Sequence, residues 1–233
     1  PLLDDYLGSF DPRIAWWRQV DWLLLGVFAA MSVLIMVRAD VKRDLRTVAV
    51  GLVGGLVIES WGTQTSLWSY YTLERPPLWI IPAWPIASLA IDRLTGFLAP
   101  HASRLGRRQT AAAYVVTFGA FGVLMVDFVR PTMGQSLTVM ALLLCAFLIA
   151  TPVQPRTALI TFAAGVALGY FLEVWGTTRG CWTYYTFQTP PLFAILAHGM
   201  AAVAFWRSGL SLSRLATDVT SRARLATRSF RRT

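Results

Sequence analysis

Residues 51–78 read GLVGGLVIESWGTQTSLWSYYTLERPPL, and residues 165–192 read GVALGYFLEVWGTTRGCWTYYTFQTPPL. The two stretches align without a gap at an offset of 114 residues, and 13 of their 28 positions are identical. Self-similarity at a fixed offset is the sequence signature of an internal repeat. The identical positions in the first stretch are Gly51, Gly55, Glu59, Trp61, Gly62, Thr63, Trp68, Tyr70, Tyr71, Thr72, Pro76, Pro77 and Leu78.

The composition around this repeat is that of a membrane protein. Hydrophobic residues make up 55% of the 233 residues, and charged residues only 14%, against about 25% charged in soluble domains. A bilayer span needs about 20 mostly apolar residues. The sequence therefore predicts an all-α, polytopic membrane helical bundle of about seven transmembrane helices. The expected spans are residues 20–37, 43–60, 77–97, 111–129, 135–152, 157–175 and 190–207.

The offset of 114 residues places the first expected span on the fifth, the second on the sixth and the third on the seventh. Matched spans lie an even number apart, so both copies cross the membrane in the same direction and form a parallel repeat. The chain then divides into repeat one at 20–110, an unpaired fourth helix with its loop at 111–134, and repeat two at 135–207. Residues 1–19 are expected to lie on the outer interface, and residues 208–233 form a basic tail.

Orientation follows from the arginines and the lysine between the spans. With seven spans, sixteen of the 21 basic residues fall on one side, which is the cytoplasmic side by the positive-inside rule. The N-terminus is then outside and the C-terminus cytoplasmic, and we expect the cytoplasmic membrane of a bacterium. Lys42 is the only lysine and lies in a charged loop, which excludes a retinal protein with a Schiff-base lysine inside the bundle.

Three carboxylates are expected to converge at the outer ends of the second, sixth and fourth spans: Glu59, Glu173 and Asp127. Acids in or near a span are costly and indicate a functional site by default. A carboxylic acid kept protonated in an apolar pocket can donate to an electron-rich centre, so these three are the candidate catalytic residues. The alternative is structural, with each glutamate accepting from loop amides or an indole N–H and Asp127 acting as an interfacial acid near Arg130.

Aromatic residues with the same spacing in both copies follow each glutamate. An aromatic belt needs no fixed spacing, so a folded, re-entrant cap over a pocket for a long apolar ligand is the favoured interpretation. His198 lies mid-span and is a candidate for moving a proton or binding a pigment. The candidate ligand-binding residues are Trp61, Trp68, Tyr70, Tyr71, Trp84, Trp175, Trp182, Tyr184, Tyr185 and His198. No metal site and no nucleic-acid partner are expected, and the sequence names no cofactor.

The run from Glu59-x-x-Gly62 through Trp68-x-Tyr70-x-Thr72 to Pro76, with Ile81-Pro82-x-Trp84 behind it, resembles membrane proteins of carotenoid biosynthesis. The family meant is the one that includes the bacterioruberin-pathway hydratases. The run Asp127-Phe-Val-Arg-Pro131 is similar to that family's ending of a later helix. The resemblance implies an isoprenoid or polyene substrate, hydration or cyclisation of a C=C bond, and Glu59, Asp127 and Glu173 as acids.

Three functions remain open from the sequence. The first is an enzyme that binds or modifies a carotenoid-like or isoprenoid lipid. The second is a non-catalytic, pigment- or lipid-binding subunit of a larger membrane protein complex. The third is a small transporter, which the parallel duplication suggests, although the spans lack the mid-membrane Gly/Pro breaks typical of transport sites. Membrane lipids, a carotenoid or other pigment, and a larger membrane complex are the corresponding candidate partners.

Overall fold

The computed structural model describes the backbone of residue 11 and of residues 13–102 and 106–230. Side chains are described over the same stretches as far as residue 214, except at residues 101 and 102. Most of the segment 1–19, expected on the outer interface, therefore lies outside the described residues. Only its last part is seen as a helix, α2, Trp16–Gln19.

The regular secondary structure of the described chain is helical apart from two strands of three residues each. The helices after α2 are α3 Trp22–Met36, α4 Val41–Gln64, α5 Ala83–Ala102, α6 Arg107–Phe128, the 3₁₀ turn η1 Arg130–Thr132, α7 Ser136–Ala150, α8 Pro155–Thr178 and α9 Leu192–Phe230. The strands are β1 Trp68–Tyr70 and β2 Trp182–Tyr184. The expected helical class is thus confirmed.

Four of these helices are long and apolar enough to cross a membrane: α4, α6, α8 and the part of α9 from Leu192 to Arg214. Helices α3 and α7 are apolar but only 15 residues long. The third expected span begins later than predicted, because residues 77–82 form turns and α5 starts at Ala83. A chain with four such helices is a membrane protein by length and composition.

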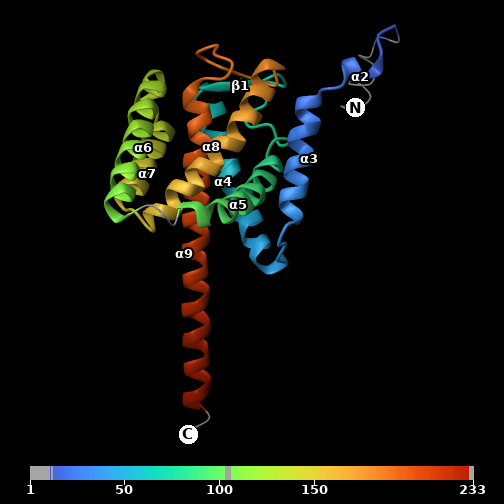
Figure 1. The fold of residues 1–233 in the computed structure, drawn as a ribbon. Coiled ribbons are helices and arrows are strands. Elements are labelled where there is room, and N and C mark those ends of the chain that lie inside the picture. Colours follow the sequence, from blue (N-terminus) through green and yellow to red (C-terminus); the bar gives the residue numbers. More distant parts are fainter. Residues whose placement is uncertain (1–10, 12, 103–105, 231–233) are drawn as a thin grey trace.

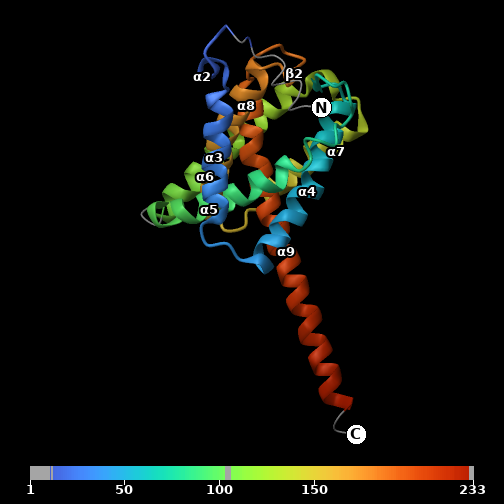
Figure 2. The ribbon, with the colours of Figure 1, turned by 90° about the vertical axis from the view of Figure 1, so that its right-hand side faces the viewer.

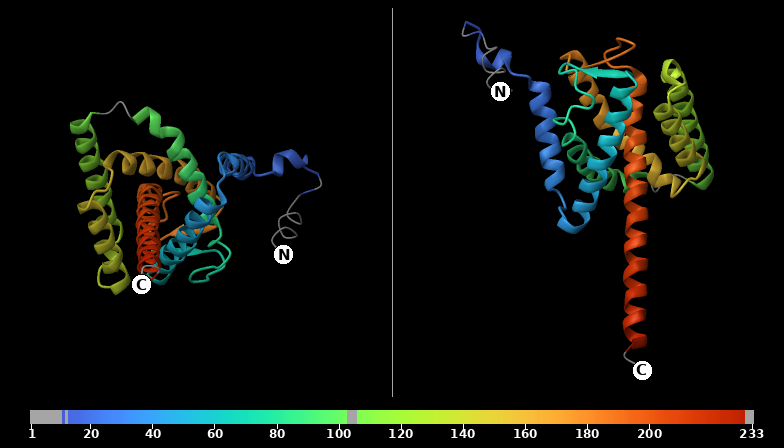
Figure 3. Two further views of the ribbon diagram at one scale, coloured as in Figure 1. Left: turned by 90° about the horizontal axis from the view of Figure 1, so that it is seen from below. Right: turned by 180° about the vertical axis from the view of Figure 1, so that it is seen from behind.

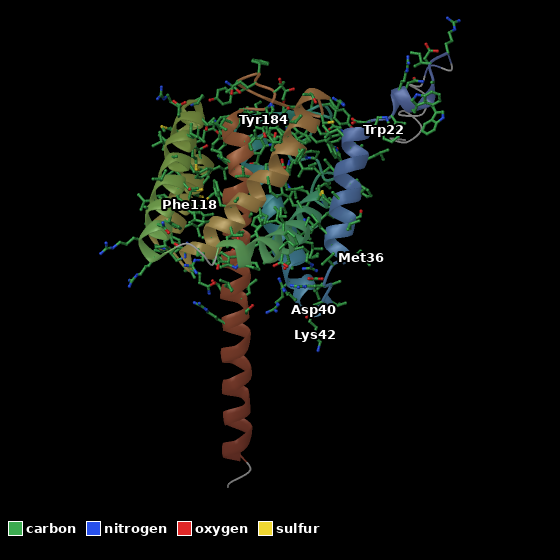
Figure 4. The ribbon with its side chains drawn as sticks, viewed as in Figure 1. Trp22, Met36, Asp40, Lys42, Phe118 and Tyr184 are labelled. Atoms are coloured by element: carbon green, nitrogen blue, oxygen red, sulfur yellow. The ribbon has the colours of Figure 1, made fainter. Side chains whose placement is uncertain are left out.

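Helices α4 and α8 run toward the same end of the bundle, where β1 and β2 lie, and α9 passes between them (Figures 1 and 2). The pair α6 and α7 stands on one side of this centre and α3 on the other (Figure 3). We call the end with the strands the aromatic end and the opposite end, where α4 begins, the basic end. Tyr184 lies at the aromatic end, and Asp40 and Lys42 lie at the basic end (Figure 4). Helix α9 continues far beyond the other helices (Figure 1).

Strands β1 and β2 pair antiparallel, with Trp68 opposite Tyr184 and Tyr70 opposite Trp182. Two flanking bonds extend this ladder: Tyr71 N–H donates to Cys181 O at 3.1 Å, and Tyr185 N–H donates to Leu67 O at 3.0 Å. The ladder joins the segment after α4 to the segment after α8. It therefore ties the ends of these two helices together over the bundle.

Each of these helices ends in the same way. Ser66 has φ 59° and Gly180 has φ 66°, which is the left-handed conformation common just after a helix C-terminus. The next residue then bonds back into the helix, with Leu67 N–H donating to Gly62 O at 2.9 Å and Cys181 N–H donating to Gly176 O at 2.8 Å. These closures lead the segments after α4 and α8 directly into β1 and β2.

Two arginines close the basic ends of the short helices. Arg93 on α5 donates from Nε to Val37 O, just after α3, at 2.8 Å. Arg207 on α9 donates to Leu148 O near the end of α7 at 2.6 Å and to Thr151 Oγ1 at 3.0 Å. A cation at a helix C-terminus also opposes the helix dipole there. Each arginine therefore attaches one of the two 15-residue helices, α3 or α7, to a neighbouring helix.

Candidate functional site

Glu59, in the last turns of α4, is 3% exposed and accepts two indole bonds. Trp68 Nε1–H donates to Oε2 at 3.1 Å, and Trp84 Nε1–H donates to Oε1 at 3.0 Å. Thr63 adds a local bond by donating from Oγ1 to the carbonyl of Glu59 at 2.6 Å. A buried carboxylate is costly unless such donors satisfy it. The indole donors agree with the structural alternative that the sequence left open for this glutamate.

Glu173, at the corresponding place on α8, is 4% exposed and has three partners, an indole, a phenol and an imidazole. Trp182 Nε1–H donates to Oε2 at 3.0 Å, and Tyr184 OH donates to Oε1 at 2.9 Å. His198 Nε2 lies 2.9 Å from the same Oε1. Thr177 Oγ1 again donates to the carbonyl of the glutamate at 2.6 Å. This carboxylate therefore contacts an imidazole, which can gain or lose a proton near neutral pH.

Two glycines make room for the indoles that reach the glutamates. A Cβ at Gly62 would lie 1.8 Å from the Trp68 ring, and a Cβ at Gly176 would lie 2.0 Å from the Trp182 ring. No side chain fits at those distances. The Trp-Gly-Thr motif is thus explained by a ring that lies flat against the helix backbone one turn beyond each glutamate.

The glycines one turn before each glutamate receive the second partner. A Cβ at Gly55 would lie 2.3 Å from the Trp84 ring, and a Cβ at Gly169 would lie 2.5 Å from the His198 side chain. Close contact between helix backbones is found one turn earlier at Gly51, where a Cβ would meet the backbone of Pro85 at 2.9 Å. At Gly55 and Gly169 the glycine admits a ring, which helix spacing alone did not indicate.

Trp84 and His198 meet each other at the centre of the bundle. Their ring centroids are 5.7 Å apart with an interplanar angle of 16°, so the rings are stacked. Phe205 packs edge-on against Trp84 at 5.9 Å. The stack joins the two buried carboxylates through their ring partners, because Trp84 binds Glu59 and His198 binds Glu173. We call these four residues the central cluster.

The strand tyrosines remain protonated next to the glutamates. Burial, and then the nearby Glu173 carboxylate, raise the pKa of the Tyr184 phenol well above its ordinary value. Burial, and then Glu59, raise the pKa of Tyr70 in the same direction. Both phenols are therefore fixed as neutral groups over the working range of pH. Among the described side chains that hydrogen-bond the two carboxylates, His198 carries the one imidazole, a ring that can either donate or accept a hydrogen bond.

The predicted ligand-binding residues Trp61 and Trp175 point away from the glutamates and fasten the short helices. Trp61 Nε1–H donates to Thr138 Oγ1 of α7 at 3.2 Å. Trp175 Nε1–H donates at 2.9 Å to Asp21, the residue that caps the N-terminus of α3. In the structure these two indoles anchor helices at the aromatic end. Asp21 was not singled out by the sequence.

The remaining candidates lie outside the central cluster. Asp127 forms an exposed pair with Arg130 at 3.2 Å, with 69% of its side chain accessible, so it does not converge with the two glutamates. Its position agrees with the interfacial alternative. Tyr71 is 54% exposed and contacts Trp79. Tyr185 OH donates to the carbonyl of Phe128 at 2.6 Å and so anchors the end of α6.

A cavity of about 300 Å³ runs from the basic end to the central cluster, between α4, α5, α8 and α9. Its volume is at the lower end of the range for ligand pockets, roughly 300–1,000 Å³. Trp84, His198 and Phe205 line one end, and Arg43 and Arg46 line the other. Most of the wall between them is apolar. Sequence reasoning expected a pocket under the aromatic cap, whereas this cavity approaches the cluster from the opposite side.

The walls also carry two buried hydroxyls, Thr95 Oγ1 and Thr161 Oγ1, that have no hydrogen-bond partner in the structure. At the mouth, an ion-pair network holds α4 to α5. Arg93 contacts Asp44 at 2.6 Å and Asp92 at 2.8 Å, and Arg43 contacts Asp92 at 2.6 Å. The sequence used these arginines only to orient the chain. Their acidic partners, Asp44 and Asp92, are on the same two helices. Counting basic residues on each side of the membrane takes no account of such acids.

Among the described residues, no group of three or more His, Cys, Asp or Glu side chains could hold a metal ion. Comparisons of the chain with models of known protein families, with curated proteins and with solved structures found no match. A functional assignment therefore depends on the cavity and the central cluster themselves.

Proposed function

We propose that this chain is an integral membrane enzyme that binds the unsaturated end of an isoprenoid lipid, such as a carotenoid precursor, and protonates a C=C bond there. One observation carries the proposal. His198 lines the cavity, and its Nε2 lies 2.9 Å from Oε1 of the buried Glu173. A carboxylate behind an imidazole stabilises the imidazolium and fixes its orientation. Because Nε2 is bonded to Glu173, the proton that the imidazolium gives to a substrate at the end of the apolar cavity is the one on Nδ1.

The reaction balances with water alone. The His198–Glu173 pair gives its proton to one carbon of the C=C bond, which leaves a carbocation on the other carbon. In a hydration, water adds its oxygen to that carbon, and the released proton returns to the pair. In a cyclisation, a second C=C bond of the substrate attacks the carbocation, and a neighbouring C–H then loses its proton to the pair.

The residues of the central cluster have separate roles in this proposal. His198 contacts the substrate, and Glu173 acts through it as a positioning residue. The faces of Trp84 and Phe205 stabilise the positive charge that develops beside them, as aromatic rings do for cations. Glu59 accepts from the indoles of Trp68 and Trp84 and supports Trp84. Asp127 has no part in the reaction.

The membrane arrangement that accompanies the proposal has seven crossings in two parallel copies, with α6 unpaired and the N-terminus outside. Corresponding contacts on the two glutamates, the two helix closures and the two arginines Arg93 and Arg207 support the duplication. Short helices α3 and α7 are then crossings that lie against longer neighbours, and local thinning of a bilayer accommodates a short span. The basic end faces the cytoplasm of a bacterium.

The test follows protonation directly, whichever product forms. Purified protein in liposomes is incubated in D₂O with an acyclic polyene, lycopene, or with a prenyl phosphate, farnesyl phosphate. Protonation of a C=C bond leaves one non-exchangeable deuterium in the product, which mass spectrometry detects. We expect His198→Gln and Glu173→Gln to lower the rate of incorporation by about 10²- to 10⁴-fold, the usual contribution of a general acid.

Asp127→Asn is the matched control, because it also removes a carboxylate near the aromatic end but leaves the cavity untouched. Its rate should equal that of the unmodified protein. Equal incorporation by Glu173→Gln, in protein that has kept its thermal midpoint, contradicts the assignment of the proton donor. No incorporation into either lipid by the unmodified protein contradicts the enzymatic proposal.

A second function, a non-catalytic lipid- or pigment-binding subunit, is favoured by the complete occupation of both buried carboxylates by donors of the protein. Such a clamp needs no reaction to explain it. Extraction in a mild detergent discriminates the two functions. Stoichiometric partner polypeptides together with a bound, chemically unchanged lipid support the subunit, and a partner-free protein that labels its lipid supports the enzyme.

A further inference from the structure

The mouth of the cavity carries one positive charge that the ion-pair network does not neutralise. Arg43 and Arg93 share the two carboxylates of Asp44 and Asp92. Arg46 donates from Nη1 to Ser213 Oγ, a neutral group, at 2.7 Å. Three guanidinium groups therefore face two carboxylates, and the excess lies at the residue that borders the opening. An anion placed there is attracted by this charge.

The cavity is also elongated along α9. Ser213 and His198 both line it and are 15 residues apart (213 minus 198) on one continuous helix. At 1.5 Å per residue, they are separated by about 22 Å. Val50 and Ile91 contribute apolar surface to the wall between them. A ligand that fills the cavity is thus long and narrow, apolar along its length and polar at one end.

We infer that the ligand is a single-chain amphiphile with a phosphate headgroup. The headgroup binds the Arg46 guanidinium at the basic end, beside Ser213, and the tail extends to His198. Phosphate fits there because its oxygens accept hydrogen bonds from the planar, charged guanidinium. The basic end of a membrane bundle is also where lipid headgroups lie. The inference rests on the proposed function for the reacting end of the tail, and it favours a prenyl phosphate over a hydrocarbon carotenoid.

Binding tests the headgroup without requiring any reaction. Farnesyl phosphate and farnesol have the same tail, and quenching of tryptophan fluorescence in liposomes gives a Kd for each. We expect farnesyl phosphate to bind about 10- to 100-fold more tightly than farnesol, which is the fold-change that hydrogen bonds to a charged group provide. Arg46→Gln should abolish this difference by weakening the phosphate while leaving the farnesol Kd unchanged.

Lys42→Gln is the matched control. It removes a positive charge from the same helix end, at a residue outside the cavity, and should preserve the preference. Equal binding of the two probes, or equal weakening by both variants, overturns the inference, because it reduces the effect to general surface charge. Competition by inorganic phosphate at the Kd of farnesyl phosphate also overturns it, since the site would then hold free phosphate.

The two proposals fail separately. A phosphate preference that depends on Arg46, together with no deuterium incorporation, leaves a lipid-binding protein and removes the enzyme. Deuterium incorporation into farnesyl phosphate at a rate that Arg46→Gln does not change keeps the enzyme and removes the headgroup site.

Discussion

The regions around Glu59 and Glu173 share their scaffold and differ in the second ring that contacts the glutamate. In each, a buried glutamate ends a long helix, one indole arrives from the following strand, and a glycine makes room for it. The second ring is an indole, Trp84, at Glu59 but an imidazole, His198, at Glu173. An indole N–H can only donate, whereas an imidazole donates, accepts and changes charge.

The difference separates what the motif requires from what one copy adds to it. Donors that cannot exchange their proton keep the Glu59 region as a fixed clamp. The Glu173 region has the same clamp through Trp182, and it adds an imidazole, His198, that lines the cavity. The indole clamp is therefore common to both regions, and the imidazole distinguishes the Glu173 region.

The largest expected effect, on stability, tests the scaffold that the two regions share. Gly62→Ala and Gly176→Ala place a methyl group about where a Trp ring now lies, so the ring must leave and its glutamate loses a donor. Overpacking costs about 1–3 kcal/mol and a buried unsatisfied group about 1–3 kcal/mol, so each variant should lower the free energy of unfolding by roughly 3 kcal/mol or more. Denaturant titration in mixed micelles measures this.

Gly119→Ala is the control for those two variants, because nothing lies within 4 Å of a Cβ at that position of α6. Ala is favoured over Gly in a helix by about 0.5–1 kcal/mol, so this variant should be neutral or slightly more stable. A strong loss at only one of Gly62 and Gly176 would show that the two regions do not share a scaffold.

The next largest effect tests how the hydrogen-bond partners of Glu59 differ from those of Glu173. In Glu59→Gln, the new NH₂ group faces an indole N–H in either orientation, because Trp68 and Trp84 occupy the two oxygens. That clash of donors should cost about 1–3 kcal/mol. In Glu173→Gln, the NH₂ can replace Oε1, because both Tyr184 OH and neutral His198 Nε2 can accept from it.

Glu173→Gln should therefore lose less than about 1 kcal/mol of stability while losing any activity that needs the proton. The same denaturant titration compares the two glutamine variants. If Glu173→Gln destabilises as much as Glu59→Gln, His198 does not act as an acceptor, and the contrast between the regions is structural only. The order of the two values matters more than either value alone.

Much of this comparison could be predicted from the sequence, because residues close along the chain determine it. The offset of 114 residues and the repeated Glu-x-Trp-Gly-Thr pattern indicated two equivalent helix ends, and an indole donor to each glutamate was one expected alternative. The position of Asp127 could not be predicted. Whether an acid in the last turn of α6 faces the bundle depends on the rotation of that helix, which packing determines.

The cavity likewise could not be predicted from the sequence. Arg46 and Ser213 are 167 residues apart and meet only because α4 and α9 pack together. His198 was singled out as a lone mid-span histidine, but its partner Glu173 lies on another helix. Both were candidates separately, and only the glycine at position 169, which admits the ring, brings them together.

The smallest effect tests a second contrast, between the anchors of the short helices. Trp175 is bonded to the carboxylate of Asp21, and Trp61 to the neutral Thr138. Burial alone raises the pKa of Asp21, but bonds from the Leu24 backbone N–H, Arg179 and Trp175 outweigh it and hold that pKa below its usual range. A lowered folded-state pKa gives stability that is present above about pH 4, the unfolded value, and lost as pH falls through the folded value.

Acid should therefore loosen α3 before α7. Because Arg179 is about half exposed, the contribution is under about 1 kcal/mol. Hydrogen exchange of the two helices between pH 6 and pH 3, corrected for intrinsic rates, measures it. Protection at the start of α3 should decline below about pH 4 while that of α7 persists, and Asp21→Asn should remove the pH dependence by making α3 weakly protected throughout. A parallel decline of both helices in the unmodified protein would mean that acid acts on the whole bundle and that the charged anchor has no separate role.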